Sequence, residues 1–176
     1  MTLSPIRRFG LITIAIVVAA LILHSQISES LVVRGDELAF SNSTAEALQK
    51  YRSAVRWDGG NASAVDRLCF HELLSHRPEL LAEAIGVADR FLNEHPNDAT
   101  ILADRALALN LSHRYAEAAR DFQMAALQKK DAELMTFAGF AALHAGDVKA
   151  AKRFFIDASR LDSHFTPARK ALARLS

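Results

Sequence analysis

The chain has 176 residues, of which 51% are hydrophobic, 7% aromatic and 23% charged, and its formal net charge is +1. This length can bury a core without disulfides or metals, and the balanced charge excludes a globally basic nucleic-acid-binding protein or an acidic tail protein. The single cysteine, Cys69, excludes an intramolecular disulfide framework and a zinc cluster built on cysteines.

The first predicted element is an apolar N-terminal helix. Residues 9–23 read FGLITIAIVVAALIL and contain no charge. At 1.5 Å per residue this run spans roughly 22 Å, and roughly 28 Å when four more residues are included, against a hydrocarbon core of about 30 Å. Arg7 and Arg8 precede the run, so the positive-inside rule holds the N-terminus in the cytoplasm. We predict a cytoplasmic stub and transmembrane anchor in residues 1–27, with the span at about 9–26.

A cleaved signal peptide is the alternative, because its apolar region is typically about 7–15 residues long. No A-x-A sequence closes the run: Ala19 and Ala20 are followed by Leu21, which is a poor cleavage context. An uncleaved anchor is therefore favoured. Both interpretations place residues 28–176 across the membrane, and we predict a single-pass protein of the bacterial inner membrane with a periplasmic domain.

A repeated pattern occupies the rest of the chain. Four segments read TAEALQKYRSAV, LAEAIGVADRFL, YAEAARDFQMAA and VKAAKRFFIDAS. Their shared alanines, Ala47, Ala84, Ala118 and Ala151, are separated by 37, 34 and 33 residues. In three segments an aromatic residue follows this alanine by four positions: Tyr51, Phe122 and Phe155. A period of this length indicates supersecondary units that bury their apolar faces by stacking.

The pattern resembles the tetratricopeptide repeat (TPR), a helix–turn–helix unit of about 34 residues. The resemblance implies repeats at 28–61, 62–98, 99–131 and 132–165, followed by a capping helix at 166–175. Position 8, where helices A and B pack closely, is small in every repeat: Gly35, Cys69, Ala106 and Gly139. The implied fold is all-α, with an N-terminal transmembrane helix followed by a right-handed α-solenoid of about four helix pairs and the cap.

Two arginines depart from this pattern. Arg34 and Arg105 occupy position 7 of their repeats, where the family usually has an apolar residue. The second repeat also carries three extra residues around Ser75 to Pro78, which predicts a longer turn between its helices.

The C-terminal end is strongly basic. Residues 31–148 carry a formal charge of −5, whereas residues 149–176 carry +5. We interpret the basic end as a solvated cap on the last repeat, with Thr166 as N-cap and Pro167 as the first helical residue. The alternative is a dock for an acidic partner or for lipid headgroups.

No motif supports catalysis or a metal site. His71 and His76 stand five residues apart, whereas the zinc-protease helix needs a spacing of four, and Pro78 predicts a turn at His76. Cys69 falls at a close-packing position, where cysteine serves as a small hydrophobic residue. We therefore predict that the protein is not an enzyme and uses no cofactor.

In the TPR family, helix A lines a concave groove that binds protein segments. Transferring the family's positions gives the following lining residues: Asp66, Phe70, Leu73, Ala103, Leu107, Asn110, Thr136, Phe140 and Leu143. Phe70, Leu107 and Phe140 form an apolar stripe that suits an amphipathic helix or an apolar peptide. The Lys, Asn and Arg residues that hold a carboxylate in chaperone-binding relatives are missing, so carboxylate capture is not expected.

The sequence favours a membrane-anchored TPR scaffold or adaptor. It would mediate protein–protein interactions in the assembly of an envelope or membrane complex, such as a pilus, a secretion system or the cytochrome c maturation machinery. The alternative is a stoichiometric accessory subunit of a large membrane complex. The expected partners are membrane or periplasmic proteins and, through residues 9–26, the bilayer; nucleic acids and small-molecule substrates are not expected.

Overall fold

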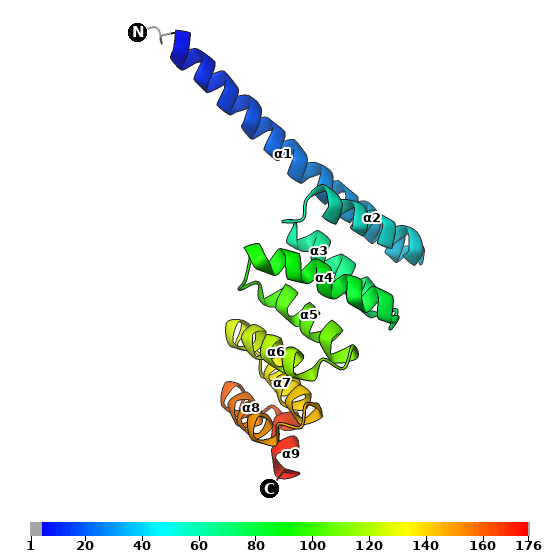
Figure 1. The fold of residues 1–176 in the computed structure, drawn as a ribbon, viewed down its shortest axis with the longest axis vertical. Helices are drawn as coiled ribbons and strands as arrows, with labels where there is room; N and C mark the ends of the chain where they lie inside the picture. The colour runs from blue at the N-terminus through cyan, green and yellow to red at the C-terminus, as the bar shows by residue number, and fades with distance from the viewer. Residues whose placement is uncertain (1–4, 176) are drawn as a thin grey trace. The chain divides into compact units, whose positions relative to one another are not determined.

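The computed structural model describes the backbone of residues 5–175 and the side chains of residues 13–175. That range consists of nine helices joined by short turns and contains no strand, which confirms the all-α class (Figure 1). The helices are α1 (Pro5–Phe40), α2 (Thr44–Trp57), α3 (Ala62–Leu73), α4 (Pro78–Glu94), α5 (Ala99–Leu111), α6 (Tyr115–Lys129), α7 (Ala132–His144), α8 (Val148–Leu161) and α9 (Thr166–Ala173). The chain divides into an N-terminal unit, Met1–Ala64, and a C-terminal unit, Val65–Ser176.

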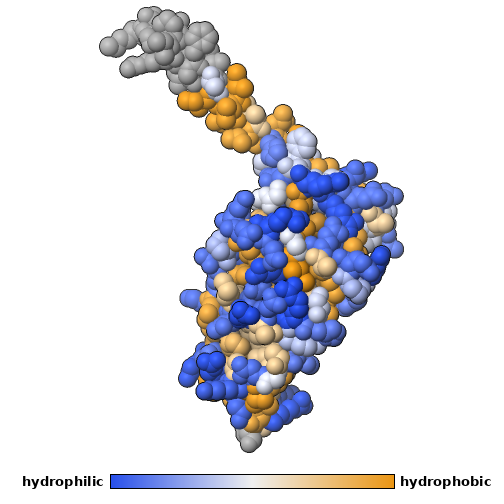
Figure 2. All heavy atoms as spheres, viewed as in Figure 1, coloured by the Kyte–Doolittle hydropathy of each residue, from blue (hydrophilic) through white to orange (hydrophobic). Residues whose placement is uncertain are grey.

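The N-terminal unit is built on one long helix. α1 has 36 residues, which corresponds to about 54 Å at 1.5 Å per residue. It contains both the apolar run and the segment expected as helix A of the first repeat, so no linker separates them. The side chains of residues 13–26 are all exposed, and Figure 2 shows their apolar surface.

α2 packs antiparallel against the C-terminal half of α1. Tyr51 is fully buried against Gly35, where the Cβ of any larger residue would collide with the tyrosine ring. The Tyr51 hydroxyl donates to Asp36 Oδ1 at 2.8 Å. Nearer the apolar run, the buried Ser28 hydroxyl donates to the Ala54 carbonyl oxygen at 3.2 Å.

The C-terminal unit contains three helix pairs, α3 with α4, α5 with α6 and α7 with α8, and α9 packs on the last pair. The alanines that set the repeat period here, Ala84, Ala118 and Ala151, are almost completely buried. Gly139 of α7 lies directly against the ring of Phe155 on α8, in the same way as Gly35 lies against Tyr51. Small residues therefore let neighbouring helices approach closely throughout the fold.

Aspartates fix several helix starts in the C-terminal unit. The side chains of Asp98, Asp131 and Asp147 accept backbone N–H bonds at the first turns of α5, α7 and α8. At α9 the prediction was wrong by one residue, because Phe165 is the N-cap and Thr166 is the first helical residue. Phe165 offers no side-chain cap, and α9 is held instead by burial of Ala168 and Ala171.

Candidate partner-binding face

The predicted lining residues stand on α3, α5 and α7, the first helix of each pair in the C-terminal unit. Three of them are large apolar side chains that remain in contact with solvent: Phe70 is 50% exposed, Leu107 40% and Phe140 40%. We call these three residues the exposed apolar row. Phe140 also packs edge-on against Phe155 with ring centroids 5.2 Å apart, so its ring is held in place while one side faces water.

Two of the nine predicted lining residues are not available on this surface. Leu73 is 8% exposed and Thr136 only 2%. The Thr136 hydroxyl donates to the Ala132 carbonyl oxygen one turn earlier at 2.8 Å, which satisfies the polar group inside its own helix and permits burial. The other four, Asp66, Ala103, Asn110 and Leu143, are partly exposed.

Asp104 is a notable residue of this region that the repeat pattern does not identify. Its Oδ2 atom is buried and has no hydrogen-bond partner among the described residues. Burial, together with the charge and hydrogen bonding of Asp66, raises the pKa of the Asp104 carboxyl to about 8, against the opposing charge of Lys129. The carboxyl therefore keeps its proton at neutral pH. The available sequence signal was a charged pair, Asp104 and Arg105, within the otherwise apolar stretch ILADRALAL.

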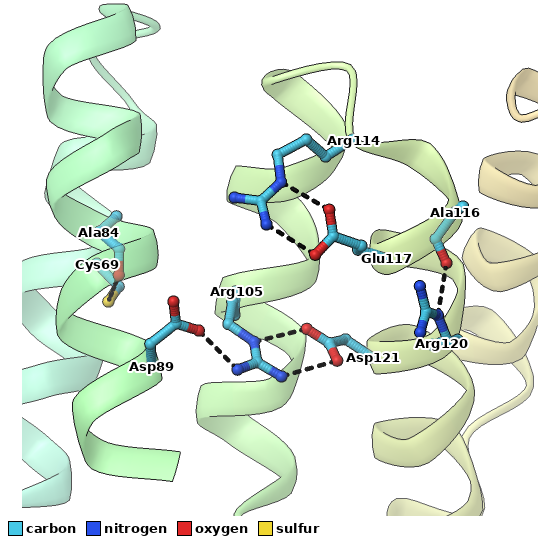
Figure 3. A network of polar contacts seen from close by, with 9 residues as sticks. All are labelled: Cys69, Ala84, Asp89, Arg105, Arg114, Ala116, Glu117, Arg120 and Asp121. Atoms are coloured by element: carbon cyan, nitrogen blue, oxygen red, sulfur yellow. Dashed lines mark hydrogen bonds and ion pairs between the residues drawn. The ribbon is translucent and has the colours of Figure 1, made fainter. Parts of the chain in front are cut away.

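Arg105, which departs from the family pattern, is the centre of an ion-pair cluster (Figure 3). Its Nε and Nη2 donate to the two carboxylate oxygens of Asp121 at 2.7 and 2.9 Å. Its Nη1 donates to Asp89 Oδ1 at 2.7 Å. The guanidinium thus joins α5 to α6 and also to α4, and these carboxylates raise its pKa. Arg105 can therefore replace the usual apolar residue at position 7, because its aliphatic stem occupies the packing position while its guanidinium is paired.

A hollow of about 310 Å³ lies beside this cluster and is lined mainly by charged side chains. The charged groups already make hydrogen bonds or ion pairs within the protein. Arg114 makes two 2.7 Å bonds to Glu117, and Arg120 Nε donates to the Ala116 carbonyl oxygen at 3.2 Å. Since these cations are occupied, we assign the hollow a structural role and not a ligand site.

The residues considered for metal binding or catalysis, His71, His76 and Cys69, do not form a common site. α3 ends at Leu73, so His76 lies in the turn that follows, whereas His71 is on the helix. Among the described side chains no group of His, Cys, Asp and Glu has the arrangement of a metal site. Cys69 is buried with its thiol 3.6 Å from the Ala84 carbonyl oxygen, and burial raises the thiol pKa. A protonated, buried thiol fits the packing role and not that of a nucleophile.

Consecutive helix pairs with a small residue at each close contact define the architecture as an α-solenoid of the TPR type. No protein-family model matches the sequence, and no curated protein sequence matches it. Solved structures do share the fold. A crystal structure of MamA has a TM-score of 0.73 at 15% identity, covering 85% of this chain and 81% of MamA.

Two further structures are similar. A tetratricopeptide repeat protein from Parabacteroides merdae has a TM-score of 0.69 at 19% identity, covering 85% of this chain and 59% of that protein. PilF of Pseudomonas aeruginosa has a TM-score of 0.66 at 20% identity, covering 86% of this chain and 68% of PilF. At these identities the likeness shows the fold alone, and the protein accordingly has a TPR-like fold.

Proposed function

We propose that this protein is a membrane-anchored TPR scaffold that binds a protein segment on the helix A side of its C-terminal unit. The exposed apolar row is the observation that carries the proposal. Single exposed apolar residues are ordinary on protein surfaces. Here one large apolar side chain occupies the same repeat position on each of three successive A helices, at 40–50% exposure. A periodic row of this kind matches an apolar or amphipathic partner segment.

The partner segment would also meet an acidic side chain on α3. Asp66 lies one helical turn before Phe70, and its charge contributes to the raised pKa of Asp104. The Asp66 carboxylate pairs with Arg67 at 3.0 Å, and Asn110, partly exposed on α5, has a side-chain amide able to bond a partner's backbone. This arrangement favours a partner segment in which apolar and polar residues alternate, and it disfavours an acidic segment.

The anchor is supported by the length and exposure of α1. Within the described residues, Thr13–Phe40 is the helix long and apolar enough to cross a bilayer, and only 11% of its most apolar window is buried. The core helix of a soluble protein would be mostly buried, whereas an anchor or a signal sequence would not. We propose an uncleaved anchor with a cytoplasmic N-terminus and a periplasmic repeat domain, which serves the assembly of an envelope or membrane complex.

Site-specific photo-crosslinking in native membranes tests the binding face. A photoreactive residue at Phe70, Leu107 or Phe140 is expected to give the same discrete crosslinked product. The matched controls are Leu127 on α6 and Ile156 on α8, which are 58% and 38% exposed but stand on B helices. Crosslinked products of equal yield from the exposed apolar row and from the control positions, or no product from the row, would contradict the proposed binding face.

Membrane attachment is tested separately on the same preparation. An anchored chain resists alkaline carbonate extraction and keeps its full-length mass. A chain that is released and shortened at its N-terminus would show that the apolar segment is a signal peptide and leave the binding face to be judged by the crosslinks alone.

A further inference from the structure

Trp57 is the only tryptophan of the chain and ends α2. Its indole Nε1 donates to the His24 carbonyl oxygen of α1 at 2.9 Å. The indole also stacks on the His24 imidazole, with ring centroids 5.3 Å apart. Even so, the side chain is 45% exposed. Two contacts therefore fix a large, half-exposed aromatic ring at the level of residue 24 on α1.

That level is the boundary of the apolar run. The contacts of α2 follow α1 in antiparallel order: Tyr51 meets Asp36, Ala54 meets Ser28 and Trp57 meets His24. Trp57 is therefore the α2 residue nearest the run 9–23, and its partner His24 is the first residue after that run. Because α1 is one unbroken helix, placing residues 9–23 in hydrocarbon places Trp57 within the first turn outside that run.

We infer that Trp57 is an interfacial anchor, whose indole lies at the lipid headgroup boundary and sets how deeply α1 enters the bilayer. The inference rests on the proposed membrane anchor and names the lipid contact made by the first helix pair. A tryptophan suits this layer because its large ring is apolar while its N–H needs a polar partner. Here the His24 carbonyl already accepts that N–H, so the ring can face lipid without an unsatisfied donor.

Charges near this level indicate which lipid feature is recognised. Glu29 follows His24 on α1, and Arg56 and Asp58 flank Trp57 in the sequence. The loop after α2 is held there as well, since Asn61 Nδ2 donates to Ser28 Oγ at 2.9 Å. With two acidic groups and one basic group, this end of the unit has no cationic excess. The contact should therefore depend on the polarity gradient of the interface and not on anionic headgroups.

Tryptophan fluorescence of the full chain in phosphatidylcholine nanodiscs tests this directly, because no second tryptophan contributes. We expect blue-shifted emission, weak acrylamide quenching, and stronger quenching by lipids brominated near the headgroup than by lipids brominated near the methyl end. Adding phosphatidylglycerol should leave the spectrum unchanged. The double variant Ile16→Trp/Trp57→Phe supplies a control, since it moves the sole tryptophan to the middle of the run 9–23 and should reverse the order of the two brominated lipids.

The outcomes separate the two proposals. One outcome overturns the interfacial role and leaves the anchor standing. In it, the emission of Trp57 is solvent-like and is not quenched by brominated lipids, although the chain still co-purifies with the nanodiscs and the control variant is quenched. Failure of both the wild type and the control variant to enter the bilayer overturns the anchor itself and the inference with it.

Discussion

The first helix pair, in the N-terminal unit, and the last, in the C-terminal unit, use the same contact in different surroundings. Gly35 lies against Tyr51, and Gly139 lies against Phe155. The residue after each glycine differs. Asp36 accepts the tyrosine hydroxyl, whereas Phe140 packs edge-on against the phenylalanine ring. The shared glycine defines the fold, and its neighbour decides whether the A helix presents a carboxylate or an apolar surface.

This comparison explains where a partner-binding face can exist. Position 9, the residue after the glycine, is Asp36 in the N-terminal unit, where it is used to hold α2 on α1. In the C-terminal unit the corresponding residues are Phe70, Leu107 and Phe140, all at least 40% exposed. The helix pairs of this chain thus use one position differently: in the pair next to the apolar run it makes a polar bond, whereas in the other pairs it exposes an apolar side chain.

The largest loss of stability is expected from breaking the charged cluster around Arg105 in the C-terminal unit. Arg105→Ala leaves Asp121, whose side chain is 9% exposed, without its guanidinium. Removing one partner of a buried pair should lower the free energy of unfolding by about 3 kcal/mol. Urea unfolding of the detergent-solubilised chain, followed by circular dichroism, measures it.

The control is Asp89→Ala. Asp89 is 52% exposed, so its removal should cost less than about 1 kcal/mol. Equal losses for the two variants would show that Arg105 acts at the surface and does not join the helices.

The glycine contact should be next in size. Gly139→Ala and Gly35→Ala each place a methyl group against a ring that is fully buried and cannot move aside. Overpacking should lower the free energy of unfolding by about 2 kcal/mol. The sign is diagnostic, because alanine in a helix is otherwise favoured over glycine by about 1 kcal/mol. Gly59→Ala should change stability little, because the added Cβ would lie at an ordinary contact distance of 3.7 Å from the Val55 carbonyl oxygen, and a gain at Gly139 would contradict the close contact.

Asp104 should make stability depend on pH. Its folded pKa of about 8 lies above the ordinary value of 3.8, so between these values the folded chain holds one more proton than the unfolded chain. Stability contributed by this group therefore falls as pH rises from about 4 to 8. Asp104→Asn should raise the melting temperature by an amount near zero at pH 4 and on the order of 5 °C at pH 8.

A second variant checks the cause. Asp66→Asn removes a neighbouring charge that raises the Asp104 pKa, so it should reduce the pH dependence without abolishing it. A pH-independent difference between Asp104→Asn and wild type would mean that folding does not raise the pKa of the Asp104 carboxyl.

Periodicity was sufficient to predict the helical fold, because the positions of Ala84, Ala118, Ala151 and Gly139 encode close packing directly. It was not sufficient for Thr136, which is buried because its hydroxyl bonds its own helix. The Arg105 cluster and the Asp104 environment were also missed, since both depend on which side chains of neighbouring helices come into register. A repeat pattern records which positions of each helix are small or apolar and not which polar side chains of neighbouring helices meet.

The smallest loss of stability is expected from Tyr51→Phe, at the contact in which the two compared pairs differ. Tyr51→Phe keeps the ring against Gly35 but removes the bond to Asp36, and should cost about 1 kcal/mol. The reciprocal change, Phe155→Tyr, adds a hydroxyl in a pair where Phe140 and not a carboxylate follows the glycine. A buried hydroxyl without a ready acceptor costs about 1–3 kcal/mol. If the reciprocal change were neutral, the residue after the glycine would not determine which aromatic the pair accepts.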